Sequence, residues 1–320
     1  MSTAASPKPP PRPITRSPFV DSTDILGDAA ALRARADEEG YLYFRRFLPE
    51  SFVHDLRADI LAVTDRFGWR VPGQDRLGGL VDPAAIDAIP DEDISSLGTG
   101  AACYREVQKL ESFHRFPHHP RLMELYRTLF QGEAVVHPRN IARMIVPHSR
   151  NFPTPQHQDF PHIQGSANTW TCWIPTGDCP RALGGLTVLR GSHKAGYMPV
   201  QPAKGAGGGG FAVQLCPWES QWVEGDFSAG DILTFHSMTV HKALPAQITD
   251  RIRLSLDVRY QPVAEPIEER SLGLHTGDIT WEDVYRDWKS DDLKYYWRRL
   301  PLTISAPFDP GYLEAKRRIC

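Results

Sequence analysis

From about residue 135 onward, short apolar runs alternate with polar turns, and this alternation limits the folds open to the chain. The runs occupy residues 141–146, 169–175, 186–189, 211–215, 232–235 and 252–260. Runs of this length, bounded by turn-forming residues, are typical of β-strands. Several short strands joined by polar turns predict a sandwich or a barrel. We therefore expect a mainly β core over residues 135–263, with α-helices flanking it.

The part of the chain before this core has helical periodicity. Helices are expected at residues 28–40, 49–67 and 120–130, with a short β-run at 41–44. Residues 69–100 contain Gly, Pro and Asp without a clear period, which predicts a long loop lying over a site. Residues 24–134 are thus expected to form the helical N-terminal part of a single domain that spans residues 19–320.

The two ends of the chain differ from its middle. Residues 1–18 are rich in proline and are expected to be a disordered tail. Residues 264–320 form an extension rich in aromatic side chains, with a helix start at Thr280 followed by an acidic first turn. Aromatic side chains mainly supply buried area, so we expect the extension to pack against the core; lining a substrate site is the alternative.

Composition excludes several classes of protein. A net charge of −3 gives no reason to expect nucleic acid or an anionic membrane as a partner. No apolar run is long enough for a transmembrane helix. Five cysteines, without a Cys-x-x-Cys pair, argue against a disulfide framework and a structural zinc site, and favour a reducing, cytoplasmic setting. The sequence does not indicate an oligomeric state.

His157 and Asp159 form a His-x-Asp motif just after the run at 141–146. Residues i and i+2 of an extended segment lie on one face, so an imidazole nitrogen and a carboxylate oxygen can reach the same point. A histidine from a distant strand would complete the two-histidine, one-carboxylate triad that holds non-haem Fe(II) and leaves coordination positions open. A single His-x-Asp also arises by chance in a chain of this size, so the motif needs support elsewhere.

The second half of such a site lies downstream. A Gly-Asp turn begins the apolar run at 232–235, and His236 and His241 follow it. In the run at 252–260, the alternation places Arg253 and Ser255 on one face. A guanidinium and a hydroxyl on one face can clamp a carboxylate. A solvent-facing polar side, which is common in antiparallel sheets, is the alternative.

Taken together, these motifs resemble the phytanoyl-CoA dioxygenase family of Fe(II)- and 2-oxoglutarate-dependent oxygenases. The resemblance extends from about residue 30 to 262. It rests on GYL at 40–42, HQD at 157–159, GGLTVLRGSHK at 184–194, GDILTFH at 230–236, His241, and DRIRLS at 250–255. The family's fold is a double-stranded β-helix, a cupin-like jelly-roll of two packed sheets, which agrees with the short strands expected above.

The resemblance implies a set of site residues. His157, Asp159 and His241 are expected to be the metal ligands, with His241 preferred to His236 because the family places its distal ligand at the second histidine. Arg253 would pair with the far carboxylate of 2-oxoglutarate. Arg251 is the alternative, because the family spacing falls between the two; Arg253 is preferred because Ser255 shares its face.

Two further side chains are expected near the cosubstrate. Thr171 stands where relatives often carry a hydroxyl that bonds 2-oxoglutarate, and Asn140 is a second candidate from the preceding strand. Trp173 is expected to face the barrel interior together with Thr171.

The implied activity is a dioxygenase reaction that uses Fe(II), 2-oxoglutarate and O2, hydroxylates a small-molecule or secondary-metabolite substrate, and releases succinate and CO2. Related halogenases have a small residue at the position of Asp159, so the carboxylate here favours hydroxylation, desaturation or another oxygenase outcome. A jelly-roll metal-binding protein without activity is the alternative. A zinc-dependent hydrolase is disfavoured because no general-base Glu accompanies the ligands.

Overall fold

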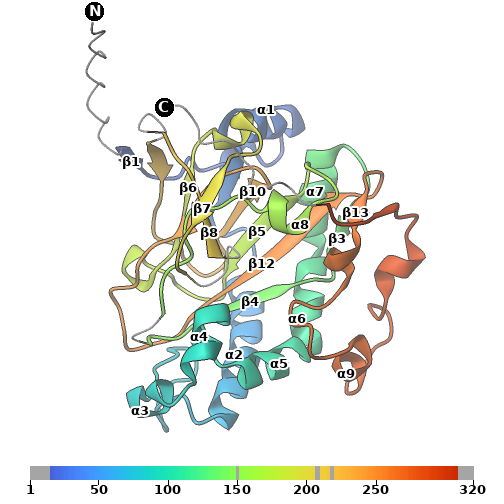
Figure 1. The fold of residues 1–320 in the computed structure, drawn as a ribbon. Helices are drawn as coiled ribbons and strands as arrows, with labels where there is room; N and C mark the ends of the chain where they lie inside the picture. The colour runs from blue at the N-terminus through green and yellow to red at the C-terminus, as the bar shows by residue number, and fades with distance from the viewer. Residues whose placement is uncertain (1–14, 149–150, 206–209, 217–219, 309–320) are drawn as a thin grey trace, which may run out of the picture.

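The computed structural model describes residues 15–148, 151–205, 210–216 and 220–308. Two β-sheets, built mainly from antiparallel strand pairs, form the centre of the protein (Figure 1). The larger sheet has the strand order β2 (Tyr41–Phe44), β10 (Ile232–His236), β5 (Trp170–Pro175), β12 (Arg253–Pro262) and β3 (Ala134–Val136), and β4 (Ile141–Ile145) also pairs with β12. The smaller sheet has the order β1 (Thr15–Ser17), β9 (Gln221–Val223), β6 (Leu186–Leu189) and β11 (His241–Ala243).

The larger sheet has two differently covered faces because side chains alternate along each strand. In β12, Leu254, Leu256, Val258 and Tyr260 join one apolar cluster with the helices. Trp173 of β5 and Phe235 of β10 point the other way, into a second cluster shared with the smaller sheet. The region between the two sheets is therefore the jelly-roll interior, and the outer face of the larger sheet is the platform for the helices.

Helices cover the outer face of the larger sheet (Figure 1). The longer ones are α1 (Ala29–Glu39), α2 (Glu50–Arg66), α5 (Ala101–Gln108) and α7 (Pro120–Phe130), with α6 (Glu111–Arg115) between the last two. The helix α1 begins at the side chain of Asp28, which accepts two backbone N–H bonds, and ends at the left-handed Gly40. The three helices expected from periodicity are thus confirmed: the first two are one residue shorter at each end, and the third has the expected bounds.

The segment at 69–100 is not the long loop that its composition predicted. It contains α3 (Pro83–Asp87) and α4 (Asp91–Leu97). Backbone hydrogen bonds tie it to the start of β12, because Val81 N–H donates to Asp250 O at 3.0 Å and Ile252 N–H donates to Gly79 O at 3.0 Å. The sequence signal failed because short helices capped by Asp and Pro leave no apolar periodicity to detect.

Both ends of the described chain contain regular secondary structure. Residues 15–17 form β1, which pairs with β9, so the expected tail of 1–18 extends too far; residues 1–14 lie outside the described part. The C-terminal extension contains β13 (Ile267–Glu268), α9 (Trp281–Tyr285) and β14 (Ile304–Ser305). Thr280 caps α9 in a capping box, as predicted. The described part of the extension packs against the β core and the helices, since Tyr296 donates to Val136 O of β3 and Trp288 donates to Lys109 O.

The described cysteines are of two kinds. Cys103, Cys172 and Cys179 are free and buried, whereas Cys216 takes part in a disulfide that the sequence did not predict.

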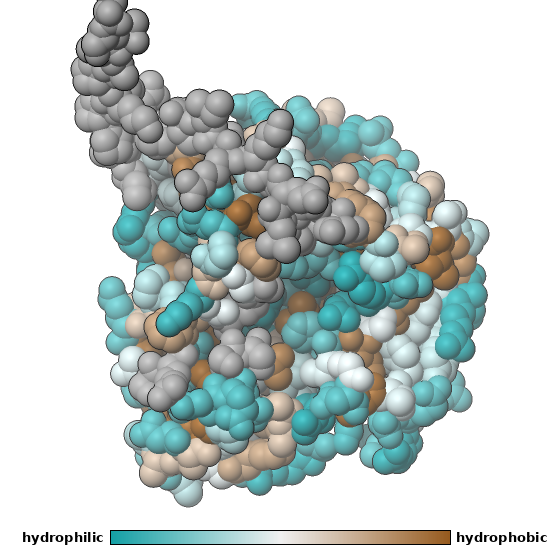
Figure 2. All heavy atoms as spheres, viewed as in Figure 1, coloured by the Kyte–Doolittle hydropathy of each residue, from teal (hydrophilic) through white to brown (hydrophobic). Residues whose placement is uncertain are grey.

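The face drawn in Figure 2 is largely hydrophilic with scattered hydrophobic patches. Among the described helices, none has the length and apolar character needed to cross a membrane. The remaining strands, β7 (Val200–Pro202) and β8 (Phe211–Val213), form a separate hairpin.

Candidate active site

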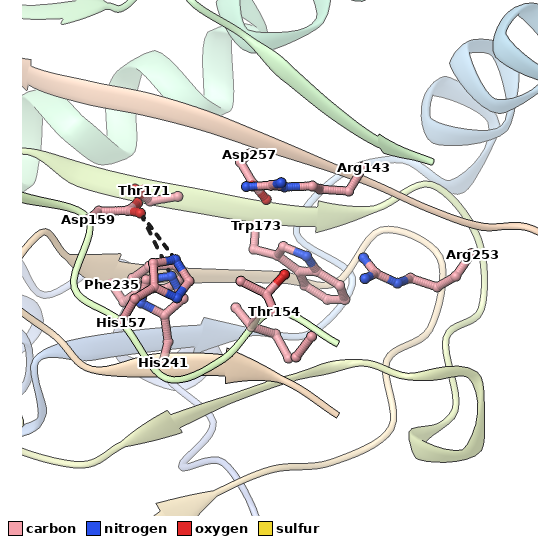
Figure 3. Close-up of a pocket in the computed structure, with 12 residues that line it drawn as sticks. Arg143, Thr154, His157, Asp159, Thr171, Trp173, Phe235, His241, Arg253 and Asp257 are labelled. Atoms are coloured by element: carbon pink, nitrogen blue, oxygen red, sulfur yellow. Dashed lines mark hydrogen bonds and ion pairs between the residues drawn. The ribbon is translucent and has the colours of Figure 1, made fainter. Parts of the chain in front are cut away.

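Two histidines and one aspartate converge at the edge of the jelly-roll interior (Figure 3). Nε2 of His157 lies 3.7 Å from Oδ1 of Asp159, and Nε2 of His241 lies 3.8 Å from the same oxygen. All three side chains are buried, and their ligand atoms lie within 4.8 Å of one another. The structure thus brings together the three residues that the sequence singled out.

The backbone holds the two histidines in place. They form an isolated antiparallel bridge in which His157 N–H donates to His241 O and His241 N–H donates to His157 O. His241 begins β11, and Asp159 follows two residues after His157, at the start of the short helix α8 (Phe160–Ile163). The His-x-Asp motif therefore leaves the edge of the smaller sheet and turns into a helix, which points both side chains inward.

Hydrogen bonds select the tautomer of each imidazole. Nδ1 of His157 lies 2.8 Å from Pro155 O, and Nδ1 of His241 lies 3.0 Å from Thr239 O. A carbonyl oxygen can only accept, so each Nδ1 carries the proton and each Nε2 keeps a free lone pair. Burial lowers the pKa of both histidines below the ordinary value, so both imidazoles are neutral near pH 7 and able to bind a metal.

Asp159 is held in the ionised form with one oxygen free. Its Oδ2 accepts hydrogen bonds from Thr171 Oγ1 at 2.5 Å and from Arg259 Nη2 at 3.4 Å. Burial alone would raise the pKa of Asp159, but the Arg259 guanidinium, the two histidines and the Thr171 hydroxyl outweigh it and hold the pKa low. Oδ1 therefore stays charged and faces the two Nε2 atoms.

This donor set fits a divalent iron. Two neutral imidazole nitrogens and one carboxylate oxygen are the ligands of a facial triad. Each ligand is fixed through its other polar atom: the two Nδ1 atoms donate to carbonyl oxygens, and Oδ2 of Asp159 accepts from Thr171. His236 is not part of the group: its Nδ1 accepts from Met238 N–H, and its ring lies edge-on to Trp170. The preference for His241 over His236 agrees with this geometry.

A cavity extends from the triad into the jelly-roll interior. Figure 3 shows Arg253 at its far end, with Trp173 between Arg253 and the triad. Apart from these residues, the lining consists of Arg143, Thr154, Thr171, Leu186, Phe235, Ala243 and Asp257. Both sheets contribute to it, so closure of the jelly-roll is what assembles the site.

Arg253 is suited to bind an anion in this cavity. Its Nη1 donates to Ser255 Oγ at 2.7 Å, and its buried Nε has no hydrogen-bond partner in the described part of the chain. A buried N–H without a partner is costly, so a carboxylate at this point would satisfy it. Arg251 lies outside the cavity lining, is partly exposed, and pairs with Asp250 at 2.7 Å. The structure therefore places Arg253, and not Arg251, in the cavity.

The two remaining predicted residues differ in position. Thr171 lines the cavity, but its hydroxyl proton is used by Asp159, so it can only accept from a ligand. Asn140 is buried with Oδ1 lacking a partner among the described residues, and it does not line the cavity. Direct contacts of either side chain with a cosubstrate stay predictions.

Several cavity residues had no role assigned from the sequence. Asp257 lines the cavity, and Arg259 contacts Asp159 without lining it; both lie on the same face of β12 as Arg253, as strand alternation predicts. Arg143 of β4 pairs with Asp257 at 2.7 Å, a contact that depends on strand pairing between β4 and β12.

A second cavity of about 470 Å³ adjoins the first, and both are lined by Arg253.

Comparison with known proteins places this geometry in a family. The sequence model of the phytanoyl-CoA dioxygenase (PhyH) family matches residues 36–254, more than half of the chain. The chain belongs to the phytanoyl-CoA dioxygenase family. Membership confirms the jelly-roll fold and the reaction class, an iron- and 2-oxoglutarate-dependent dioxygenase, that the sequence resemblance implied.

The chain is also similar to individual proteins in sequence and to solved structures in fold. The 1-deoxypentalenic acid 11-beta-hydroxylases of Streptomyces arenae and Streptomyces exfoliatus are each 27% identical over 262 residues, covering 78% of this chain and 87% of theirs. The epimerase SnoN, solved with Fe3+, alpha-ketoglutarate and nogalamycin RO, has a TM-score of 0.52 at 20% identity over 75% of this chain and 86% of its own. The likeness to SnoN concerns the fold.

Proposed function

We propose that this PhyH-family protein hydroxylates a small organic molecule, with iron held by His157, Asp159 and His241 and 2-oxoglutarate anchored by Arg253. The convergence of two Nε2 lone pairs and one carboxylate oxygen in a buried pocket carries this proposal. The 1-deoxypentalenic acid 11-beta-hydroxylases among the relatives support a small-molecule substrate. Bound iron, with 2-oxoglutarate and O2, supplies the oxidation that places oxygen on substrate carbon and yields succinate and CO2.

The residues of the chain have separate tasks in this proposal. His157 and His241 present neutral nitrogens, and the bonds to Pro155 O and Thr239 O keep their rings from rotating. Asp159 contributes the negative charge, and Thr171 restricts it to a single free oxygen. Because a carboxylate occupies this position, the site favours an oxygenase outcome over halogenation.

The cosubstrate end of the pocket depends on Arg253. Its guanidinium lies with Cζ 6.0 Å from the Trp173 ring centre, and its Nη1 is fixed by Ser255. A charged pair between Arg253 and a carboxylate gains strength where little water is present. Trp173, Phe235 and Leu186 supply apolar walls that exclude water between the metal and Arg253.

The proposal is tested by following succinate formation from 2-oxoglutarate in the presence of Fe(II) and O2. Asp159→Ala should reduce succinate formation to the background level, because the triad loses its only anionic ligand. His236→Ala serves as the matched control, since His236 lies nearby but outside the triad. Full succinate formation by Asp159→Ala, or none by the wild-type protein with iron bound, would contradict the proposal and favour a metal-binding protein without activity.

A further inference from the structure

A partly buried ion pair lines the cavity and is used neither by the triad nor by Arg253. Arg143 of β4 donates from Nε to Oδ2 of Asp257 on β12 at 2.7 Å. The side chains are 16% and 14% exposed. Ion pairs contribute little net stability, whether they are exposed and screened or buried and desolvated, so stability alone does not account for this pair in an active-site cavity.

The terminal nitrogens of Arg143 are available to a ligand. In the part of the chain that the structure describes, only Nε of Arg143 is hydrogen-bonded, and the bond to Asp257 fixes the plane of the guanidinium. Figure 3 shows this group along the cavity wall, above Trp173 and between the triad and Arg253. Two free terminal nitrogens in one plane match the two oxygens of a carboxylate.

The charge balance of the site leaves room for one anion. Three guanidinium groups, those of Arg143, Arg253 and Arg259, lie in or directly behind the cavity, against the two carboxylates of Asp159 and Asp257. Fe(II) together with the 2-oxoglutarate dianion adds no net charge. One positive charge therefore remains in a buried site, where an unbalanced charge is costly, and a bound monoanion would balance it.

The neighbouring surfaces fit an apolar body attached to that anion. Arg143 and Ile145 lie on the same face of β4, and Ile145 lines the adjoining cavity of about 470 Å³. That cavity is walled mainly by apolar residues, including Val146, Phe152 and Leu244. A compact hydrocarbon could occupy this cavity while its charged end reaches Arg143.

We propose that Arg143, oriented by Asp257, binds the carboxylate of the substrate, so that the substrate is a small carboxylic acid with an apolar body. This inference rests on the proposed function, because it assumes that 2-oxoglutarate is bound to Arg253. Arg143 then determines specificity: it orients the substrate and discriminates against neutral analogues, whose binding would leave its terminal nitrogens without partners.

The test compares acids with their methyl esters. The anaerobic protein loaded with Fe(II) and 2-oxoglutarate is titrated calorimetrically with cyclohexanecarboxylate, 1-adamantanecarboxylate and abietate, and with the methyl ester of each. At least one acid should bind about 10-fold or more tightly than its ester. Arg143→Gln should weaken binding of that acid by about 10- to 100-fold and remove the difference from the ester, while the affinity for 2-oxoglutarate changes less than about twofold.

Two further variants make the result specific. Arg143→Lys keeps the charge but cannot bind two oxygens in one plane, so it should retain a preference for the acid with weaker affinity than wild type. Arg251→Gln is the matched control, since Arg251 is partly exposed and pairs with Asp250 outside the cavity. This variant should bind acid and ester as wild type does. If Arg143→Gln does not fold, Arg143→Lys and the wild-type comparison decide the question.

The inference fails if no acid binds more tightly than its ester, or if Arg143→Gln or Arg143→Lys leaves the acid affinity unchanged. It also fails if the Arg143 variants lose affinity for 2-oxoglutarate, which would assign Arg143 to the cosubstrate. These results differ from failure of the proposed function itself, in which the wild-type protein would not form a complex with Fe(II) and 2-oxoglutarate.

Discussion

His157 and His241 exchange both of their backbone hydrogen bonds, at 2.9 Å and 3.0 Å, although 84 positions separate them in the sequence. Such a hydrogen-bonded antiparallel pair fixes the spacing of the two Cα atoms. The two imidazoles therefore face the metal position from a rigid frame, and only Asp159 approaches from outside it. This frame explains why side chains from two distant motifs can form a preorganised metal site.

Thr171 should influence metal affinity through Asp159. Thr171→Val removes the hydroxyl that donates to Oδ2 and leaves the shape of the side chain nearly unchanged. Loss of a hydrogen bond to a metal ligand typically costs about 10-fold or more in metal affinity. We expect Co(II) or Mn(II) to bind about 10-fold more weakly, as measured by calorimetry.

The control for this change is Thr187→Val, which removes a buried hydroxyl bonded to Val223 O on the smaller sheet, away from the triad. It should leave metal affinity unchanged. Equal losses in the two variants would show that Thr171 acts on stability and not on the position of Asp159.

Arg253 should govern the affinity for 2-oxoglutarate. Arg253→Gln removes the charge that balances the far carboxylate, and a charge-assisted pair of bonds accounts for about 10- to 100-fold in affinity. The KM for 2-oxoglutarate should rise by about this factor in a succinate assay. Arg251→Gln should leave it unchanged; a larger effect at Arg251 would reverse the assignment between the two arginines.

Stability should fall in mild acid because of buried neutral histidines. The His114 side chain is buried, with Nε2 hydrogen-bonded to Gln108 O and its ring packed on Trp288. Burial lowers the pKa of His114 from 6.5 to about 4. The unfolded state then binds more protons than the folded state, so the free energy of unfolding falls as the pH drops from about 6.5 to about 4.

The contribution of His114 over this range is up to about 3 kcal/mol. Denaturant unfolding at a series of pH values measures it. His114→Gln should flatten the pH dependence relative to the wild-type protein. An unchanged slope in His114→Gln would contradict this account.

Gly230 should be intolerant of a side chain. Gly230 lies in the turn before β10 with a φ of +93°, and a Cβ there would overlap the carbonyl oxygen of Leu48. Gly230→Ala should lower the free energy of unfolding by about 2 kcal/mol or more. Gly27→Ala is the control, because a Cβ at Gly27 meets nothing within 4 Å; equal melting temperatures of the two variants would contradict the prediction.

Elements with a strong local pattern were predictable from the sequence. Helices such as α2 and α7 carry a continuous apolar stripe, and β12 has strict alternation, so both type and orientation followed from periodicity. The triad was predictable for a different reason, since the family motifs identify residues that the backbone brings together only after folding.

Elements without a local pattern could not be predicted. The strands β3, β7, β9 and β11 have three residues each, too few to show alternation, and they exist because a neighbouring strand supplies their hydrogen bonds. The Arg143–Asp257 pair likewise depends on the register between β4 and β12. For Asn140, the resemblance implied a contact with the cosubstrate; its side chain does not line the cavity beside the triad, and the contact stays a prediction.

The central claim is that His157, Asp159 and His241 hold iron beside a 2-oxoglutarate site formed by Arg253. The most direct measurement is an anaerobic titration of the metal-free protein with Fe(II) and then 2-oxoglutarate, following the visible iron-to-ketoacid charge-transfer band. We predict a band in the wild-type protein that is absent in His241→Ala and weakened in Arg253→Ala. A folded, iron-bound wild-type protein without the band would contradict the claim.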